Sequence, residues 1–201
     1  MIRIPSSLKA FIDELSDLPS IGPRQATRLA FHLVGKGKQS VANLADNLNK
    51  LKNIKVCARC FFIHENPGEL CDVCADKERN QKTIMIVEKE TDLISIEQTK
   101  KYFGRYLVLG VIPKTGILDD IQKLRLQNLK SFVQKELDGQ AEEIILGFNP
   151  TSVGDWNAGI LRKELDGFSK KITRLGRGLP TGGEIEFADD ETLEGALEGR
   201  S

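Results

Sequence analysis

The 201-residue sequence has no apolar run near the ~18 to 20 residues that a membrane-spanning helix requires. Its start, Met1 to Pro5, carries no apolar signal segment. Net charge is also missing, because 29 lysines and arginines match 29 aspartates and glutamates. We therefore expect a cytoplasmic protein without membrane contact, and its overall charge gives no sign of a polyanionic partner.

The charge is unevenly distributed along the chain. Residues 1–60 carry ten lysines and arginines against four acids, a net charge of +6. Residues 61–201 carry 19 against 25, a net charge of −6. This asymmetry favours a basic N-terminal arm on a more acidic body, although charge also varies along chains that lack such a function.

Cysteine is scarce, and all of it lies in two Cys-x-x-Cys pairs, Cys57 with Cys60 and Cys71 with Cys74. Two such turns supply the four thiolates of a tetrahedral zinc site. The alternatives are two disulfides, which a reducing cytosol disfavours, or a redox dithiol, which needs only one pair. We predict a structural Zn²⁺ site, because four protein ligands leave no open position for catalysis.

Residues 1–53 show the apolar periodicity of three amphipathic helices. Between the first two, the Pro and Gly residues of Leu18–Arg24 predict a tight hairpin. Backbone N–H groups at Ile21 and Gly22 and the start of the second helix can bind a phosphate there. Arg24 and Arg28 lie one helical turn apart at its mouth. An ordinary helical pair with solvated arginines is the alternative.

This hairpin resembles the helix-hairpin-helix motif of proteins that bind DNA without sequence specificity. The usual motif has glycine where this chain has Ser20, which we expect to avoid a positive φ. His32, near the apolar face of the second helix, is expected to pack in a core. His64, inside the cysteine loop, is expected to be solvated rather than a fifth ligand.

Beyond Cys74, short apolar runs alternate with helical patterns, which indicates βαβ units and a mainly parallel sheet. We predict strands at 84–87, 106–110, 143–148 and 171–175, and helices at 92–101, 119–137 and 155–165. In the long helix, Ile121 and Leu124 are expected to face inward with Leu129, Phe132 and Val133. Glu88 follows the first strand, so it lies on the edge where α/β sheets bind ligands.

The order of these features resembles the bacterial RecR family of recombination mediators along nearly the whole chain. The matching segments are the hairpin Leu18–Arg24 with Arg28–Leu33, the cysteine segment Cys57–Asp76, Val87-Glu88 with Asp92 and Ile96-Glu97, Gly104–Tyr106, the Gly-rich Arg174–Glu186 and the ending Asp189–Arg200. The family is identified by their joint order rather than by any single motif.

The resemblance implies an α+β protein with four parts. Residues 1–53 would be a helix-hairpin-helix DNA-binding domain, and 54–79 a four-cysteine zinc finger. Residues 80–175 would be an α/β Toprim domain with a mainly parallel sheet. Residues 176–201 would be a Gly-rich and acidic strand-helix tail for oligomerisation or a partner, with a strand at 184–187 and a helix at 190–198.

The resemblance also implies a function. Members of the family form a dimeric or tetrameric ring that encircles single- or double-stranded DNA without sequence preference. With RecO, and with RecF where it is present, they help RecA to load on single-stranded DNA at gaps. The DNA-contacting positions would be Arg24 and Arg28, with Ile21 and Gly22 at the turn.

A Mg²⁺-dependent Toprim nuclease or topoisomerase is the alternative function. Such enzymes hold Mg²⁺ with a glutamate after the first strand, here Glu88, and a later Asp-x-Asp. This chain has only the adjacent pair Asp119-Asp120, whose side chains diverge by about 100° on a helix. We expect no catalysis, and a structural, weak metal-binding or partner-facing role for Glu88 and Asp92. A zinc-stabilised scaffold that binds only proteins is a third hypothesis.

Overall fold

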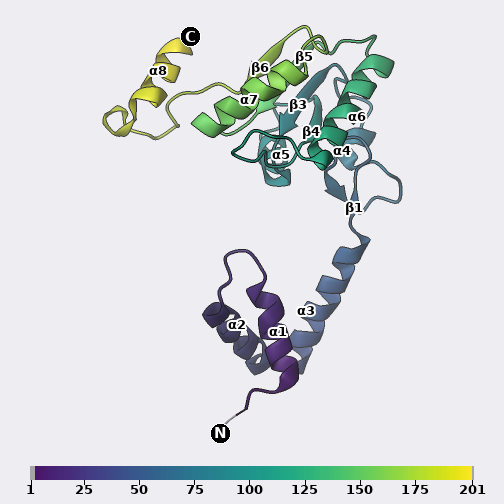
Figure 1. The fold of residues 1–201 in the computed structure, drawn as a ribbon, viewed down its shortest axis with the longest axis vertical. Coiled ribbons are helices and arrows are strands. Elements are labelled where there is room, and N and C mark those ends of the chain that lie inside the picture. The colour runs from purple at the N-terminus through teal and green to yellow at the C-terminus, as the bar shows by residue number, and fades with distance from the viewer. Residues whose placement is uncertain (1–2, 201) are drawn as a thin grey trace. The chain divides into compact units, whose positions relative to one another are not determined.

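The computed structural model describes residues 3–200 of the chain. The chain divides into two compact units, residues 1–54 and residues 55–201. Figure 1 labels the elements of both units, and each unit is described by itself. No helix among residues 3–200 is long and apolar enough to cross a membrane.

The first unit is helical. It contains α1 (Ser6–Ser16), α2 (Pro23–Gly35), α3 (Lys38–Lys50) and the short 3₁₀ helix η1 (Leu51–Asn53). Its buried core consists of Ile12 on α1 and Ala26 and Ala30 on α2. Two alanines at this contact let the first two helices approach closely, as small side chains at helix interfaces do. The expected three helices are therefore present, with a small core between two of them.

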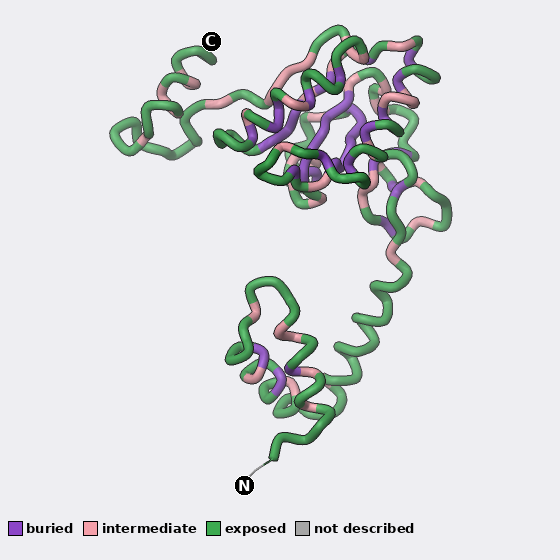
Figure 2. The backbone as a smooth tube through the Cα atoms, viewed as in Figure 1, coloured by how far each residue is buried: buried purple, intermediate pink, exposed green. Residues whose placement is uncertain are grey.

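Helix α3 buries none of its residues. Its apolar side chains do share one face, but Val41, Leu44 and Leu48 are 43%, 36% and 53% exposed. Figure 2 shows the helix as exposed over most of its length. An apolar stripe on a soluble helix is ordinarily buried, whereas this one is only partly covered and lines an open groove with side chains of α1 and α2.

The second unit is built on a four-stranded sheet of order β4-β3-β5-β6. Its strands are β3 (Thr83–Val87), β4 (Arg105–Val108), β5 (Glu143–Gly147) and β6 (Ile172–Arg174), and all neighbouring pairs are parallel. The predicted α+β class and parallel sheet are confirmed. The connecting helices are α5 (Glu90–Gln98), α6 (Asp120–Glu136) and α7 (Ser152–Glu164).

The two faces of the sheet are covered differently. One face, with Ile84, Ile86 and Leu107, packs on α6 and α7 in a continuous core. The other face, with Met85 and Tyr106, packs on α5 and on the cysteine segment. Burial on both faces explains why β3, β4 and β5 are mostly apolar rather than alternating in pattern.

The cysteine segment contains the antiparallel pair β1 (Lys55–Val56) and β2 (Ile63–His64) and the short helix α4 (Asp72–Ala75). The backbone N–H of Val108, at the end of β4, donates to the carbonyl of Cys60 at 2.8 Å. The segment is therefore hydrogen-bonded to the sheet edge as well as packed on its face.

Two local expectations were wrong. Ile121 and Leu124 on α6 are 62% and 56% exposed, and Gln122, Leu126, Leu129 and Val133 form the buried face instead. Residues 184–187 do not form a strand, because η2 (Ile185–Phe187) is a 3₁₀ helix. The expected acidic helix is present as α8 (Asp190–Glu198).

The C-terminal tail is tied to α7 by ion pairs. Asp155 on α7 pairs with both Arg174 and Arg177, and Arg177 also pairs with Glu191 on α8 at 2.9 Å. Hydrogen bonds from Arg174 hold the pKa of Asp155 below its usual range. The exposed tail thus has a fixed electrostatic contact with the body of the second unit.

Candidate metal centre and nucleic-acid interface

The four cysteines converge on one point. Their sulfurs lie within 4.8 Å of one another, all four side chains are buried, and none forms a disulfide. Ligands placed 2.3 Å from one tetrahedral ion lie about 3.8 Å apart, and the Sγ atoms of Cys60 and Cys71 are 3.5 Å apart. Four soft thiolates at this spacing fit a tetrahedral metal ion with no open position.

Local backbone bonds hold the two cysteine turns together. The N–H of Cys57 donates to the carbonyl of Phe62 at 2.8 Å, and the N–H of Cys71 donates to the Cys57 sulfur at 3.4 Å. Phe61 adopts a φ of 62°, which closes the first turn. Hydrogen bonds from the other thiols, Cys60 first, lower the pKa of Cys57, whereas hydrogen bonds with Cys57 raise the pKa of Cys60 and of Cys74.

An ion-pair network links the end of the cysteine segment to the sheet. Arg79 binds the carboxylate of Glu97 on α5 through two nitrogens and donates to the carbonyl of Gly104 at 3.1 Å. The hydroxyl of Tyr106 on β4 donates to the same carboxylate at 2.8 Å. Arg79 and Tyr106 therefore both bind the carboxylate of Glu97, so that three segments of the chain are joined at one side chain. No periodic pattern in the sequence predicts this network.

His64 is 92% buried rather than solvated, so the expectation for it was wrong. Its Nδ1 accepts a hydrogen bond from the backbone of Asn66 at 3.2 Å. It does not join the group of metal-type side chains found among residues 3–200, which consists of the four cysteines. His64 therefore orders the loop between the two cysteine pairs.

The basic hairpin lies at the start of α2. Gly22 is the N-cap residue and Pro23, which has no N–H, is the first helical residue, so the first helical N–H group is that of Arg24. Arg24, Gln25, Arg28, Leu29 and His32 line a shallow groove of about 560 Å³. No carboxylate within residues 3–200 forms an ion pair with Arg24 or Arg28. The structure brings the two arginines to one surface, next to the turn at Ile21 and Gly22.

Two expectations for this hairpin need correction. Ser20 does adopt a positive φ, 66°, so the turn takes the shape that glycine usually provides. A non-glycine residue in this region carries a modest backbone strain. His32 is exposed in the groove rather than packed in a core, because α2 buries only Ala26 and Ala30.

The two acidic candidates at the sheet edge are not brought into a carboxylate cluster. Glu88 is 8% exposed at the end of β3. The carboxylate of Asp92 accepts a hydrogen bond at 3.0 Å from the N–H of Lys89, the N-cap residue of α5. Asp92 therefore has a structural role in the start of this helix.

Comparison with known proteins places the chain. Residues 8–52 match the family model described as RecR, helix-hairpin-helix, residues 82–176 match a Toprim domain, and residues 178–201 match RecR, C-terminal. The chain is 41% identical over 202 residues to recombination protein RecR of Deinococcus radiodurans, covering 99% of this chain and 88% of that protein. The chain belongs to the RecR family.

Other RecR proteins cover the chain as fully. Recombination protein RecR of Rubrobacter xylanophilus is 39% identical over 203 residues, which is all of this chain and 98% of that protein. The protein of the same name in Frankia alni is 39% identical over 193 residues, covering 94% of this chain and 93% of that protein. The resemblance stated from the sequence is thus confirmed. The RecR helix-hairpin-helix match contains the basic groove, and the Toprim match contains the sheet.

Sequence reasoning missed two charged residues that the RecR fold buries. Arg79 has a side chain that is only 11% exposed, and Arg105 is 6% exposed within β4. Arg105 had been noted only as part of the family segment Gly104–Tyr106. An available signal was its position at the start of an apolar strand, since an arginine is seldom fully buried without a partner.

Proposed function

We propose that this RecR-family protein is a non-enzymatic mediator of DNA recombination and repair. It would act as an oligomeric clamp on single- or double-stranded DNA, without sequence preference. With RecO, and with RecF where that protein is present, it would promote RecA loading on gapped single-stranded DNA in the cytoplasm. The observation that carries this proposal is the unpaired basic groove of α2 inside the RecR helix-hairpin-helix match.

The DNA contact is argued from charge and geometry. Arg24 and Arg28 lie one turn apart on α2, at the positive end of the helix dipole. Arginine keeps its charge at all working pH values, and its planar fork fits phosphate oxygens. Contacts of this kind neutralise the DNA backbone without reading base edges, so affinity should fall steeply with salt. Ile21 and Gly22 would shape the turn against the backbone.

The oligomer is argued from the exposed apolar surface of the first unit. A groove of about 340 Å³ between the three helices is lined by Leu8, Phe11, Leu33, Leu44 and Leu48 among others. Its apolar face is of the kind that marks an interaction surface. A second copy can offer the same groove, so a two-fold dimer would cover both faces at once, and further contacts would close a ring.

The remaining parts would support this clamp. We propose that Cys57, Cys60, Cys71 and Cys74 hold a structural Zn²⁺ that organises residues 54–79. Residues 80–175 would form the Toprim body, with Glu88 and Asp92 in structural or partner-facing roles. Residues 176–201 would serve oligomerisation or a partner. We keep the four-part division of the chain that the sequence predicts.

The test is the double variant Arg24→Ala, Arg28→Ala in the full chain. Fluorescence anisotropy with single- and double-stranded DNA of two unrelated sequences, across a salt series, would measure affinity. We expect weaker binding to all four DNAs and a salt slope that is shallower by about 2, or about one per lost phosphate contact.

The matched control is Lys50→Ala, Lys52→Ala, which removes the same charge from exposed positions at the end of α3 and in η1. Unchanged affinity of the arginine variant, with the control equally unchanged, would overturn the assignment of the hairpin. If the protein cleaves the DNA in the presence of Mg²⁺ and Glu88→Gln abolishes this cleavage, the mediator proposal is wrong and the protein is a Toprim enzyme. A RecA-loading assay with RecO tests the mediator role itself.

A further inference from the structure

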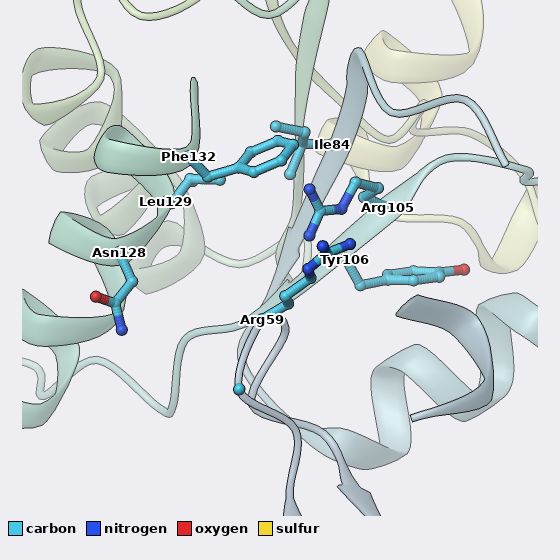
Figure 3. A pocket seen from close by; sticks show the side chains of 8 residues that line it. Arg59, Ile84, Arg105, Tyr106, Asn128, Leu129 and Phe132 are labelled. Carbon is cyan, nitrogen blue, oxygen red and sulfur yellow. The ribbon is translucent and has the colours of Figure 1, made fainter. Parts of the chain in front are cut away.

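The second unit contains a cavity that the proposed function does not use. It has a volume of about 260 Å³ and lies between the first cysteine turn, β4 and α6. Figure 3 shows Arg59 and Arg105 on one side of it, and Phe132, Leu129 and Asn128 on α6 on the other. All of its lining residues belong to residues 55–201, so the cavity is separate from the basic hairpin.

Arg105 is the most unusual residue of this cavity. It is 94% buried, and its guanidinium carbon lies 3.8 Å from the centroid of the Phe132 ring. Its Nη1 atom is buried without a hydrogen-bond partner among residues 3–200. Burial lowers the pKa of Arg105, which reflects the free-energy cost of desolvating this charge. A buried donor of this kind is ordinarily satisfied by a protein acceptor, an ordered water or a bound ion, and residues 3–200 supply no acceptor here.

A second positive charge faces the same space. Arg59 lies in the Cys57–Cys60 turn, is exposed, and its charge lowers the pKa of Arg105 further. No aspartate or glutamate lines the cavity, and no carboxylate within residues 3–200 forms an ion pair with either arginine. Two like charges therefore converge without an acidic partner.

The sulfur of Cys74 also lies near Arg105. A metal-bound thiolate at this position would supply part of the opposing charge. A sulfur is nevertheless a weak hydrogen-bond acceptor, and Nη1 remains without a partner despite its proximity. Electrostatic compensation by the thiolates does not fill the cavity or satisfy the donor.

We propose that this cavity binds a phosphate monoester, held by the guanidinium groups of Arg59 and Arg105 and by the side-chain amide of Asn128. Such a group carries a charge of about −1.5 to −2 near neutral pH and has three strong acceptor oxygens, which matches two cations. The guanidinium fork matches its oxygens, whereas a carboxylate offers one charge and two oxygens. Phe132 and Leu129 give the remaining volume an apolar wall.

Two sources have this chemistry, a free nucleotide and the 5′-phosphate end of a DNA strand. The volume beside the arginines is larger than a phosphate alone needs, so the group attached to the phosphate would enter along Phe132. The inference does not depend on the proposed clamp, because its first test uses neither DNA nor the hairpin.

The first test titrates the full-length, metal-loaded protein with inorganic phosphate, using sodium chloride to keep the ionic strength constant. Calorimetry gives the affinity, and the arginine Nε–H signals in ¹H–¹⁵N spectra report which side chains respond. We expect saturable binding that Arg59→Ala weakens by about tenfold or more, the size expected for a lost hydrogen bond between charged groups. Arg162→Ala, an exposed arginine on α7 outside the cavity, should bind as the unchanged protein does.

Arg105→Met should abolish binding while it keeps an apolar contact with Phe132. Since Arg105 is buried beside Cys74, Arg105→Met can also disturb folding. The variant that decides the proposal is therefore Arg59→Ala, because Arg59 is exposed. If the arginines only balanced the charge of the metal centre, Arg59→Ala would lower metal content and leave phosphate binding unchanged, which would overturn the proposal. No saturable binding to the unchanged protein, or acetate binding as tightly as phosphate, would also overturn it.

A second set of titrations separates the two sources. It compares adenosine monophosphate with single-stranded oligonucleotides of one sequence that end in a 5′-phosphate or a 5′-hydroxyl. Tighter binding of the 5′-phosphorylated strand, lost in Arg59→Ala, assigns the site to DNA ends. Binding of the mononucleotide without preference between the strands assigns it to a free nucleotide. Failure of both ligands would contradict the monoester proposal.

Discussion

The two units of the chain complete their cores to very different degrees. Residues 55–201 bury both faces of a parallel sheet, one against α6 and α7 and the other against α5 and the cysteine segment. Among residues 3–54, the fully buried apolar side chains are Ile12, Ala26 and Ala30. Two of these are alanines, which remove little apolar surface from water.

This difference has a thermodynamic meaning. Burial stabilises by about 25 cal/mol per Å² of apolar surface, and a domain of about 60 residues is already marginal. The sheet unit can satisfy this requirement from its own core and from a metal. The helical unit leaves the apolar face of α3 in solvent, so we expect its stability to depend on association. Folding and assembly are therefore coupled in one unit and separable in the other.

The largest effect should come from removing the metal. Cys60→Ser should abolish metal binding and release the cysteine segment from the sheet face, since zinc contributes about 10–16 kcal/mol to small four-ligand sites. We expect a much lower unfolding midpoint for the second unit. Elemental analysis gives the metal content, and fluorescence of Trp156, the only tryptophan, reports denaturation of the second unit.

Metal depletion and re-addition provide the control for the cysteine variant. Treating the unchanged protein with a chelator should reproduce the loss, and adding Zn²⁺ should restore it. A second unit that unfolds at the same denaturant concentration in Cys60→Ser would show that the sheet does not depend on a metal. The contrast between the two units would then rest on hydrophobic packing alone.

A smaller effect is expected from a charge on the apolar face of α3. Leu44→Glu places a carboxylate in the groove that we propose is covered by a second copy. Burying a leucine is worth about 1.5–3 kcal/mol, so its loss should raise the dissociation constant of the oligomer by about 10- to 100-fold. Light scattering after size-exclusion chromatography, over a dilution series, would measure the change.

The control for that variant is Gln39→Glu on the polar face of the same helix, which adds the same charge away from the groove. The side-chain amide of Gln39 donates to the side-chain oxygen of Asn43 at 3.0 Å, within α3 itself. Gln39→Glu removes this one hydrogen bond and should leave the mass distribution of the oligomer unchanged. An oligomer that is equally stable in both variants would show that α3 is not an interface. The open core of the first unit would then need another explanation.

Much of the fold could be predicted from the sequence, and the failures have identifiable causes. Three of the four strands, β3, β4 and β5, were predicted because each lies in an apolar run of strand length. The face of α6 was misjudged because it includes a buried glutamine. Gln122 exchanges capping hydrogen bonds with Asp119 and donates to the carbonyl of Val111 at 2.9 Å. A polar residue satisfied in this way interrupts the apolar pattern that reveals a buried face.

The candidate sites also differ in how far the sequence predicts them. The cysteine cluster was predictable because its ligands are close in sequence and their spacing is set by local turns. The cavity with Arg59, Arg105 and Asn128 was not, because these residues come from segments separated by 46 and 23 positions. Their meeting depends on the packing of the cysteine segment and α6 around β4. The positive φ of Ser20 likewise depends on the hairpin as a whole and not on residue type.

The smallest effect should come from the carboxylate that joins the cysteine segment to the sheet. Burial alone would raise the pKa of Glu97, but hydrogen bonds from Arg79 and Tyr106 hold it below its usual 4.5. A depressed pKa in the folded state stabilises above the unfolded value of 4.5, and this stabilisation is lost as pH falls through the folded value. Glu97→Gln should therefore lower the free energy of unfolding by about 1–3 kcal/mol at pH 7.

The pH dependence decides whether charge is the cause. As the pH falls below 4.5 and through the lowered pKa of Glu97 in the folded state, the native carboxylate becomes protonated. The difference between Glu97→Gln and the unchanged protein should therefore shrink, as followed by Trp156 fluorescence in denaturant. Glu136→Gln, at an exposed position on α6, should have no effect at either pH. A difference that stayed constant with pH would assign the role of Glu97 to shape and neutral hydrogen bonding. A difference that vanished would show that one ion-pair network joins the metal segment to the sheet in the unit that folds on its own core.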